Sequence, residues 1–279
     1  MATDPFQART AVVTGGASGI GLALARAFAA RGANLVLADI DAAALAEAER
    51  ALAASGAAVL CVRTDVTKRD EVQALADAAF RRFGAVHLVC NNAGIATFGE
   101  IARAPRSDWE FTMNVDFWGV VNGIEAFVPR LVAQGQGGHV VNTASMAGLV
   151  GMQWLGIYCA AKFAVVGLTE ALQRELRPHG IGVSVLCPMI VATNIGANSV
   201  RWRPRELGGD PAAPPPPGGA MQGGTVSAED VADRVVRAIE RGDLYVLTHP
   251  EQREILRRRA ARLEAACDAA FGPGPEPGA

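Results

Sequence analysis

Residues 10–39 of the chain read TAVVTGGASGIGLALARAFAARGANLVLAD. The apolar run Ala11–Thr14 predicts a buried strand, Gly21–Arg31 predicts a helix, and Asn34–Asp39 predicts a second strand. Two strands joined in this way form a βαβ unit, in which the strands are parallel and the helix packs back on the sheet. This stretch therefore predicts a parallel sheet covered by helices.

The turn between the first strand and the helix is rich in glycine. Thr14–Gly21 reads TGGASGIG, which places glycines in a G-x-x-x-G-x-G spacing. Backbone amides at a helix N-terminus bind phosphate groups, and glycine lets a ligand approach the backbone closely. The turn therefore predicts a site for a dinucleotide pyrophosphate, with a plain strand–helix corner as the alternative.

Asp39 ends the second strand. A carboxylate there can accept hydrogen bonds from the adenosine ribose hydroxyls, and it would repel a 2′-phosphate. No Arg or Lys lies in the glycine turn or directly after Asp39, so the pattern favours NAD over NADP. The alternative role, capping the next helix, suits Asp41 better.

The strand–helix alternation continues along the rest of the chain. Further strands are expected at Val59–Arg63, Val86–Cys90, His139–Thr143, Val183–Leu186 and Leu244–Leu247. Helices are expected at Asp41–Ser55, Lys68–Phe83, Trp109–Val132, Ile157–Arg177 and Ala228–Arg241. Arg203–Gly224 contains four consecutive prolines, which excludes a regular helix or a central strand and predicts a mobile lid or a partly disordered insertion.

Composition narrows the class of protein. Half of the 279 residues are hydrophobic, enough for a large core, and the formal net charge of −2 indicates neither a nucleic-acid nor an anionic-membrane partner. No secretory leader pattern and no apolar stretch of about 20 residues is present. The five cysteines form no C-x-x-C pair, and the four histidines have no metal-ligand spacing. We therefore expect a cytoplasmic protein without a metal.

Tyr158 and Lys162 are four residues apart on an expected helix, so they share a face. An ammonium beside a phenol stabilises the phenolate and lowers the pKa of the tyrosine, which gives a proton donor and acceptor. Ser145 follows the strand His139–Thr143, at the edge of the sheet where ligands bind. Its hydroxyl could hydrogen-bond a substrate oxygen. Alone, the Tyr–Lys spacing is common by chance.

Together these motifs resemble the short-chain dehydrogenase/reductase family. Thr14–Gly21 matches its glycine turn, Asn91–Gly94 reads NNAG, and Ser145, Tyr158 and Lys162 match its catalytic residues. The resemblance covers about residues 8–250. It implies an α/β fold: one Rossmann-like domain, residues 1–271, with a doubly wound parallel sheet of about seven strands and helices on both faces. A mobile substrate loop at 194–224 and a flexible tail at 272–279 are expected.

The resemblance also implies site residues. It makes Asn114 a fourth catalytic residue, which holds a water that relays protons through Lys162. It implies that Pro188–Thr193 lies beside the nicotinamide, with Met189 where the family pattern has glycine. The expected NAD contacts are Gly15, Ser18, Gly19, Ile20, Gly21, Asp39, Asp65, Val66, Asn92, Ala93, Gly94, Tyr158, Lys162, Pro188, Val191 and Thr193.

A substrate pocket is expected beside Tyr158. Its residues would be Ser145, Met146, Ala147, Met152, Trp154, Tyr158 and Met189. No Arg or Lys lies in Met146–Leu155, which predicts an apolar or aromatic substrate without a carboxylate. Packing of Met152 and Trp154 in a subunit interface is the alternative. Arginines at 201, 203 and 205 argue against the apolar interpretation, because a mobile loop could bring one inward.

The expected function is an NAD-dependent oxidoreductase that interconverts a secondary alcohol and a ketone, with Tyr158 as acid and base. Gly137–Leu149 and Leu244–Glu251 are similar to a bacterial subgroup that includes dehydrogenases of benzylic alcohols. The alternatives are hydroxysteroid or acyl-carrier-linked ketones as substrates, and a non-catalytic dinucleotide sensor or scaffold. Family analogy implies a homotetramer, or a homodimer, packed through the long helices at 109–132 and 157–177.

Overall fold

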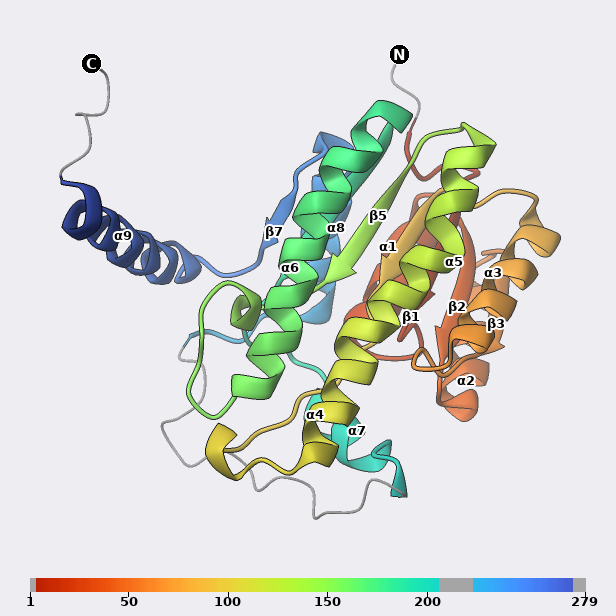
Figure 1. Cartoon of the computed structure of the whole chain (residues 1–279). Coiled ribbons are helices and arrows are strands. Elements are labelled where there is room, and N and C mark those ends of the chain that lie inside the picture. The colour runs from red at the N-terminus through yellow and green to blue at the C-terminus, as the bar shows by residue number, and fades with distance from the viewer. Residues whose placement is uncertain (1–3, 206–222, 273–279) are drawn as a thin grey trace.

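The computed structural model describes residues 4–205 and 223–272. The four prolines at 214–217 and the tail at 273–279 lie outside the described residues. The fold is built on a sheet of seven parallel strands in the order β3-β2-β1-β4-β5-β6-β7 (Figure 1). These strands are β1 (Thr10–Thr14), β2 (Asn34–Asp39), β3 (Val59–Arg63), β4 (Leu88–Asn91), β5 (Gly138–Thr143), β6 (Ile181–Cys187) and β7 (Tyr245–Leu247). The expected doubly wound, parallel sheet is confirmed.

Helices cover both faces of the sheet. Neighbouring residues of a strand point to opposite faces, so they pack against different helices. Val13 packs with the helices α1 (Gly19–Ala30), α2 (Ala42–Ala54) and α8 (Ala228–Arg241). Val12 packs on the other face with α3 (Arg69–Phe83), α5 (Gly119–Gln134) and α6 (Gly156–Leu176). Both faces of the central strands are therefore buried, as parallel sheets require.

The expected helix Trp109–Val132 is divided in the structure. The helix α4 (Arg106–Met113) runs into a π-helical segment, Asn114–Trp118, before α5 begins at Gly119. The amide of Gly119 donates to the carbonyl of Asn114, five residues earlier. Gly119 also lies against Val66, where an added Cβ would be 2.8 Å from the valine Cγ2. The π turn changes which residues of this segment face the sheet.

Two further helices lie outside the ranges given above, and the second contains the arginines at 253, 257, 258, 259 and 262, whose spacing in the sequence is helical. The helix α7 (Ile195–Arg201) occupies the start of the expected substrate loop, so this part of residues 194–224 is regular structure. The helix α9 (Gln252–Phe271) extends away from the body, and only its first residue is buried (Figure 1). Among the described residues, no helix has the length and apolar character needed to cross a bilayer.

Candidate active site

A cavity of ≈ 490 Å³ opens at the carboxyl ends of the central strands. It runs from the glycine turn after β1, past the ends of β2, β3 and β4, to the residues that follow β5 and β6. Fifteen of the sixteen expected NAD-contact residues line it, and Gly21 does not. The structure therefore brings the residues of the cofactor prediction to one continuous site.

The glycine turn is shaped by close contacts of the backbone. Gly15 has a φ of +63°, and an added Cβ would lie 2.9 Å from the Cα of Ala93. A Cβ on Gly21 would overlap the carbonyl oxygen of Gly15, so Gly21 lets α1 pack against the turn. Ser18 precedes α1 but makes no side-chain capping hydrogen bond. The amides of the first turn of α1 therefore remain available to a phosphate.

Asp39 ties the end of β2 to the glycine turn. Its carboxylate accepts hydrogen bonds from the amides of Ala17 and Asp41, each at 3.1 Å. Burial raises the pKa of this carboxyl, and the two amides oppose that effect. The side chain also lines the cavity, so it is placed to meet the hydroxyls of an adenosine ribose.

Two cations lie near this end of the cavity that the sequence argument did not place beside Asp39. Lys68 lines the cavity beside Asp65 and Thr67. Arg201, at the end of α7, forms an ion pair of 3.2 Å with Asp41. Both residues are distant from the glycine turn in sequence, so only the tertiary fold reveals them.

Asn92 fastens the NNAG segment to β1. Its side-chain amide donates to the carbonyl of Thr14 at 3.1 Å, and its backbone amide donates to the hydroxyl of Thr14 at 2.9 Å. The hydroxyl of Thr143 donates to Asn92 Oδ1 at 3.3 Å. These bonds hold the backbone of Asn92–Gly94 at the wall of the cavity.

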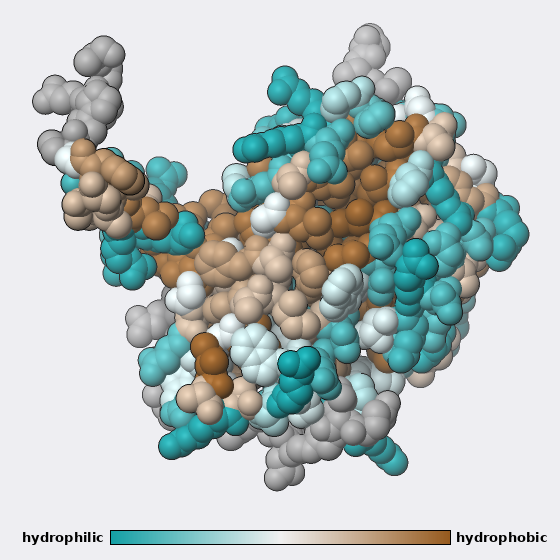
Figure 2. Space-filling model, in the orientation of Figure 1, coloured by the Kyte–Doolittle hydropathy of each residue, from teal (hydrophilic) through white to brown (hydrophobic). Residues whose placement is uncertain are grey.

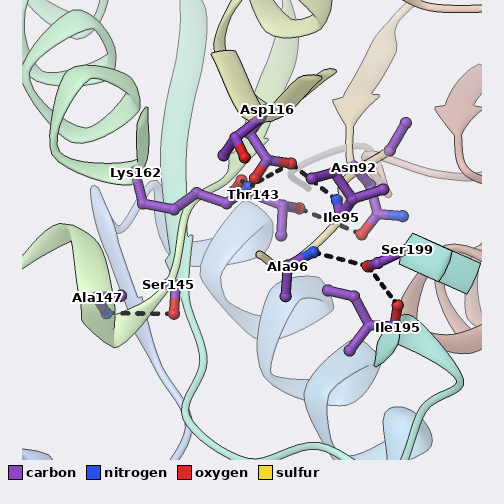
Figure 3. Close-up of polar contacts among 12 residues, drawn as sticks. Asn92, Ile95, Ala96, Asp116, Thr143, Ser145, Ala147, Lys162, Ile195 and Ser199 are labelled. Carbon is purple, nitrogen blue, oxygen red and sulfur yellow. Dashed lines mark hydrogen bonds and ion pairs between the residues drawn. The ribbon is translucent and has the colours of Figure 1, made fainter. Parts of the chain in front are cut away.

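Ser145, Tyr158 and Lys162 converge on the same cavity. Ser145 Oγ donates to the carbonyl of Pro188 at 3.3 Å and accepts from the amide of Ala147 at 3.2 Å. Lys162 Nζ donates to the carbonyl of Thr143 at 3.1 Å, as Figure 3 shows. The three expected catalytic side chains therefore come from two elements, the turn after β5 and the helix α6.

The electrostatics of Tyr158 differ from the sequence expectation. Lys162 Nζ lies 5.4 Å from the centre of the Tyr158 ring, but only 3.6 Å from Asp116 Oδ1. Burial raises the pKa of Tyr158, the charge of Asp116 raises it further, and a hydrogen bond with Ser145 lowers it. The expected lowering of the Tyr158 pKa is not found: burial is the largest cause of its raised pKa, and Lys162 has a carboxylate partner close by.

Asn114, the fourth expected catalytic residue, lines the same cavity as Ser145, Tyr158 and Lys162. Its side chain is exposed at the rim of the cavity, whereas Asp116 is fully buried beside Lys162. The π-helical segment that begins at Asn114 directs Asp116, two residues later, toward α6. Asp116 is thus the acidic neighbour of Lys162 in this segment, and the water-mediated role expected of Asn114 stays a prediction.

The expected substrate wall is only partly present. Ser145, Tyr158 and Met189 line the cavity, but Met146, Ala147, Met152 and Trp154 do not. Met146 is fully buried, with its sulfur 3.4 Å from the Gln252 side-chain nitrogen. Ala147 and Met152 pack in a small cluster behind Tyr158. Trp154 has a φ of +67°, and its carbonyl accepts a hydrogen bond from Gly99. The path of this loop turns these side chains away from the cavity.

Other apolar residues take their place. Phe98 and Leu155 pack around Tyr158, and both line the cavity together with Phe111, Ile195 and Trp202. Phe98 follows the NNAG segment closely in sequence, which is the one signal that could have predicted it. Leu155 directly precedes α6 and ends the stretch 147–155 that was expected as a wall, and Ile195 and Trp202 lie in the expected substrate loop. Phe111 comes from α4, whose position depends on the fold.

An arginine lies behind this apolar wall. The guanidinium of Arg203 is 5.7 Å from the centre of the Phe111 ring and forms a buried ion pair of 2.6 Å with Asp108. It also donates to Ser107 Oγ at 3.0 Å. Its charge is thus matched by a carboxylate on α4. Of the expected inward-turning arginines, Arg201 is likewise paired with an aspartate, at Asp41.

In residues 4–205 and 223–272, no three His, Cys, Asp or Glu side chains come together as a metal site. The described cysteines are all free thiols. Of these, Cys90, Cys159 and Cys187 are buried and Cys267 is exposed.

Comparison with known proteins gives consistent matches. The sequence model of the family described as short chain dehydrogenase matches residues 9–204. A short chain dehydrogenase/reductase from Burkholderia phymatum, solved in complex with NAD, is 40% identical with a TM-score of 0.84, covering 99% of each chain.

Two curated relatives are named dehydrogenases. The 1-deoxy-11-beta-hydroxypentalenate dehydrogenase of Streptomyces exfoliatus is 38% identical, over 90% of this chain and 87% of its own length. The C alpha-dehydrogenase of Sphingobium sp. strain NBRC 103272 / SYK-6 is 35% identical, over 91% of this chain and 84% of its own length.

Proposed function

Since the chain belongs to the short-chain dehydrogenase family and is therefore an oxidoreductase, we propose that it interconverts a secondary alcohol and a ketone with NAD. The observation that carries the proposal is the convergence of Ser145, Tyr158 and Lys162 on a cavity that begins at the glycine turn. A phosphate site and a proton donor at two ends of one cavity suit a dinucleotide and a carbonyl substrate.

The roles of the three residues follow from their contacts. Tyr158 donates its hydroxyl proton to the substrate oxygen in reduction and takes it back in oxidation. Ser145 donates a hydrogen bond to the same oxygen, for which its single hydroxyl proton turns from the carbonyl of Pro188, while the amide of Ala147 still donates to its Oγ. Lys162 supplies a positive charge held by the carbonyl of Thr143. When bound, NAD supplies or accepts the hydride.

The geometry of the chain's residues suits a dinucleotide. Gly15 and Gly19 both have positive φ, and an added Cβ on Gly15 would press on Ala93. The turn thus offers backbone amides where a side chain would obstruct the phosphates. We favour NAD over NADP because the carboxylate of Asp39 faces the cavity and would repel a 2′-phosphate. Of the nearby cations, Arg201 is already paired with Asp41.

The substrate is proposed to be an apolar ketone or secondary alcohol of aromatic or bulky alicyclic shape. Support comes from the apolar side chains of the cavity: Phe98 and Leu155 pack with Tyr158, and Phe111 and Trp202 line the same cavity. A substrate carboxylate would have to be buried against these groups without a partner, which is costly. The arginine behind Phe111 is engaged by Asp108.

We further propose that the chain acts as a cytoplasmic homotetramer or homodimer. Apolar residues gather over α5 and α6 on the face shown in Figure 2, the two helices expected to pack across an interface. Trp118, which directly precedes α5, is half-exposed. The buried free thiols of Cys90 and Cys187 suit a reducing compartment. Sedimentation equilibrium tests the assembly: a monomer at micromolar concentration would refute it.

The activity is tested with NADH and a panel of ketones, followed by the absorbance of NADH. We expect uncharged aryl ketones to be reduced, and matched ketones that carry a ring carboxylate to react at least about tenfold more slowly. NADPH in place of NADH should give a lower kcat/KM. A panel in which no ketone and no secondary alcohol is converted would refute the proposal.

A further inference from the structure

Asp116 is a buried carboxylate beside the Tyr–Lys pair, and the proposed mechanism gives it no role. Its side chain is 0% exposed. Oδ1 accepts a hydrogen bond of 2.9 Å from the amide of Ile95 and lies 3.6 Å from Lys162 Nζ. Oδ2 is buried without a hydrogen-bond partner among the described residues. A charge in such a place is costly unless an opposite charge balances it.

The contacts of the Lys162 ammonium show which groups lie closest to its charge. Figure 3 shows the ammonium between the carbonyl of Thr143 and the carboxylate of Asp116. The ammonium is 5.4 Å from the centre of the Tyr158 ring, so it is nearer to the carboxylate than to the ring. A positive charge that already has a negative partner stabilises a second anion less strongly. Asp116 therefore weakens the influence of Lys162 on the phenol.

Other groups that face Tyr158 are few. Cys159 lies on its own helix, Cys187 ends β6, and Ser145 follows β5. Burial holds the pKa of the Cys187 thiol at about 12, so this group stays neutral near pH 7. Lys162 and Asp116 are thus the two charges that act on Tyr158 at close range, within the part of the chain that the structure describes.

We propose that Asp116 is a positioning residue: its carboxylate holds the ammonium of Lys162 and offsets its charge at Tyr158, which keeps Tyr158 in the protonated, proton-donating form. This inference rests on the proposed function, because it concerns the same proton transfer. A protonated Tyr158 suits ketone reduction near neutral pH, and alcohol oxidation would become fast only at higher pH.

Gly94 is the residue that makes room for this pair. An added Cβ at Gly94 would be 2.9 Å from Asp116 Oδ1 and 3.4 Å from Lys162 Nζ. The backbone of the NNAG segment thus lies against the ion pair. The amide of the next residue, Ile95, donates a hydrogen bond to the carboxylate of Asp116. The NNAG segment, which lines the cavity, is therefore in direct contact with Asp116, the residue that holds Lys162.

The experiment observes the ionisation of Tyr158 directly. The chain has two tyrosines, so Tyr245→Phe leaves Tyr158 as the one that remains. Tyrosine labelled with ¹³C at Cζ then reports the phenolate by NMR during a pH titration. Asp116→Asn in this background is expected to move the transition to lower pH by about one unit or more, because the ammonium loses its countercharge. Asp116→Glu, which keeps the charge, is expected to titrate as the parent does.

Asp108→Asn is the matched control, because it removes another buried carboxylate that pairs with Arg203 instead of Lys162. It should leave the transition of Tyr158 in place. Coincident midpoints for Asp116→Asn and the parent would overturn the inference. If the parent unfolds below the pH at which Tyr158 ionises, the parent has no midpoint to compare. Asp116→Asn must then show the ionisation of Tyr158 at a pH where circular dichroism still reports folded protein. A folded Asp116→Asn without that transition would equally overturn the inference.

The kinetics give a second, independent readout. Asp116→Asn should shift the pH profile of kcat/KM for alcohol oxidation toward lower pH, and an unshifted profile would count against the inference. Should the protein convert no alcohol or ketone at all, the proposed function fails, and the NMR titration still decides the role of Asp116.

Discussion

Gln252 joins the base of α9 to the backbone beside the active site, and its replacement gives a worked stability prediction. The side chain is 0% exposed. Its oxygen accepts from the amides of Thr248 at 2.8 Å and His249 at 2.9 Å, and its nitrogen donates to the carbonyl of Cys187 at 2.7 Å. Gln252→Leu keeps a similar volume but leaves two buried amides and one buried carbonyl without this partner.

The magnitude follows from these three groups. A buried polar group that loses its partner costs about 1–3 kcal/mol, so the three together predict a loss of about 3–9 kcal/mol. This is a large part of the ~5–15 kcal/mol that stabilises an ordinary domain. Because Cys187 directly precedes the segment Pro188–Thr193, which lines the cavity, the KM for NAD should rise as well.

The assay is equilibrium unfolding in urea, followed by the fluorescence of the four tryptophans, at one protein concentration for all variants. Gln153→Leu, at an exposed position, is the control and should change the unfolding free energy by less than about 0.5 kcal/mol. A loss below about 1 kcal/mol for Gln252→Leu would refute the reasoning.

The other predictions concern the cofactor and pH. Asp39→Ser removes the carboxylate that faces the ribose site, so the NADP/NAD ratio of kcat/KM should rise at least about tenfold, as steady-state kinetics would measure; an unchanged ratio would contradict the assignment. Burial lowers the pKa of His139 to about 4. Between pH 6.5, near the ordinary pKa of histidine, and pH 4, the imidazole of His139 is therefore protonated in the unfolded chain and neutral in the folded chain. The unfolding free energy should therefore fall as the pH drops through this range, by about 3 kcal/mol in all. His139→Gln should flatten that dependence in urea unfolding at several pH values, and an equally steep curve would assign the effect to another group.

Much of the fold follows from local sequence. The strands β1 and β2 and the helix α1 begin and end within two residues of the ranges expected from the apolar pattern of residues 10–39. The glycines of the turn and the spacing of Tyr158 and Lys162 are also local patterns, so their meeting at one end of a parallel sheet could be inferred from topology. The cavity lined by these residues agrees with that inference.

The remaining features depend on contacts between distant segments. Which residue of 109–132 faces Lys162 depends on the π turn at Asn114–Trp118, and a helical period gives no sign of that turn. The pairing of Arg201 with Asp41 joins the end of α7 to the residue that precedes α2. The path of the loop that follows Ser145 decides that Met152 packs behind Tyr158 and Leu155 lines the cavity. None of these contacts can be predicted from a short-range pattern in the sequence.

The most direct test compares the wild-type protein with Tyr158→Phe in the NADH-dependent reduction of the best aryl ketone of the panel, with NADH binding measured by fluorescence on both proteins. Loss of a proton donor predicts a kcat lower by about 10²–10⁴-fold, at an NADH dissociation constant within about threefold of wild type. Equal kcat values for the two proteins would show that the phenol of Tyr158 does not supply the proton.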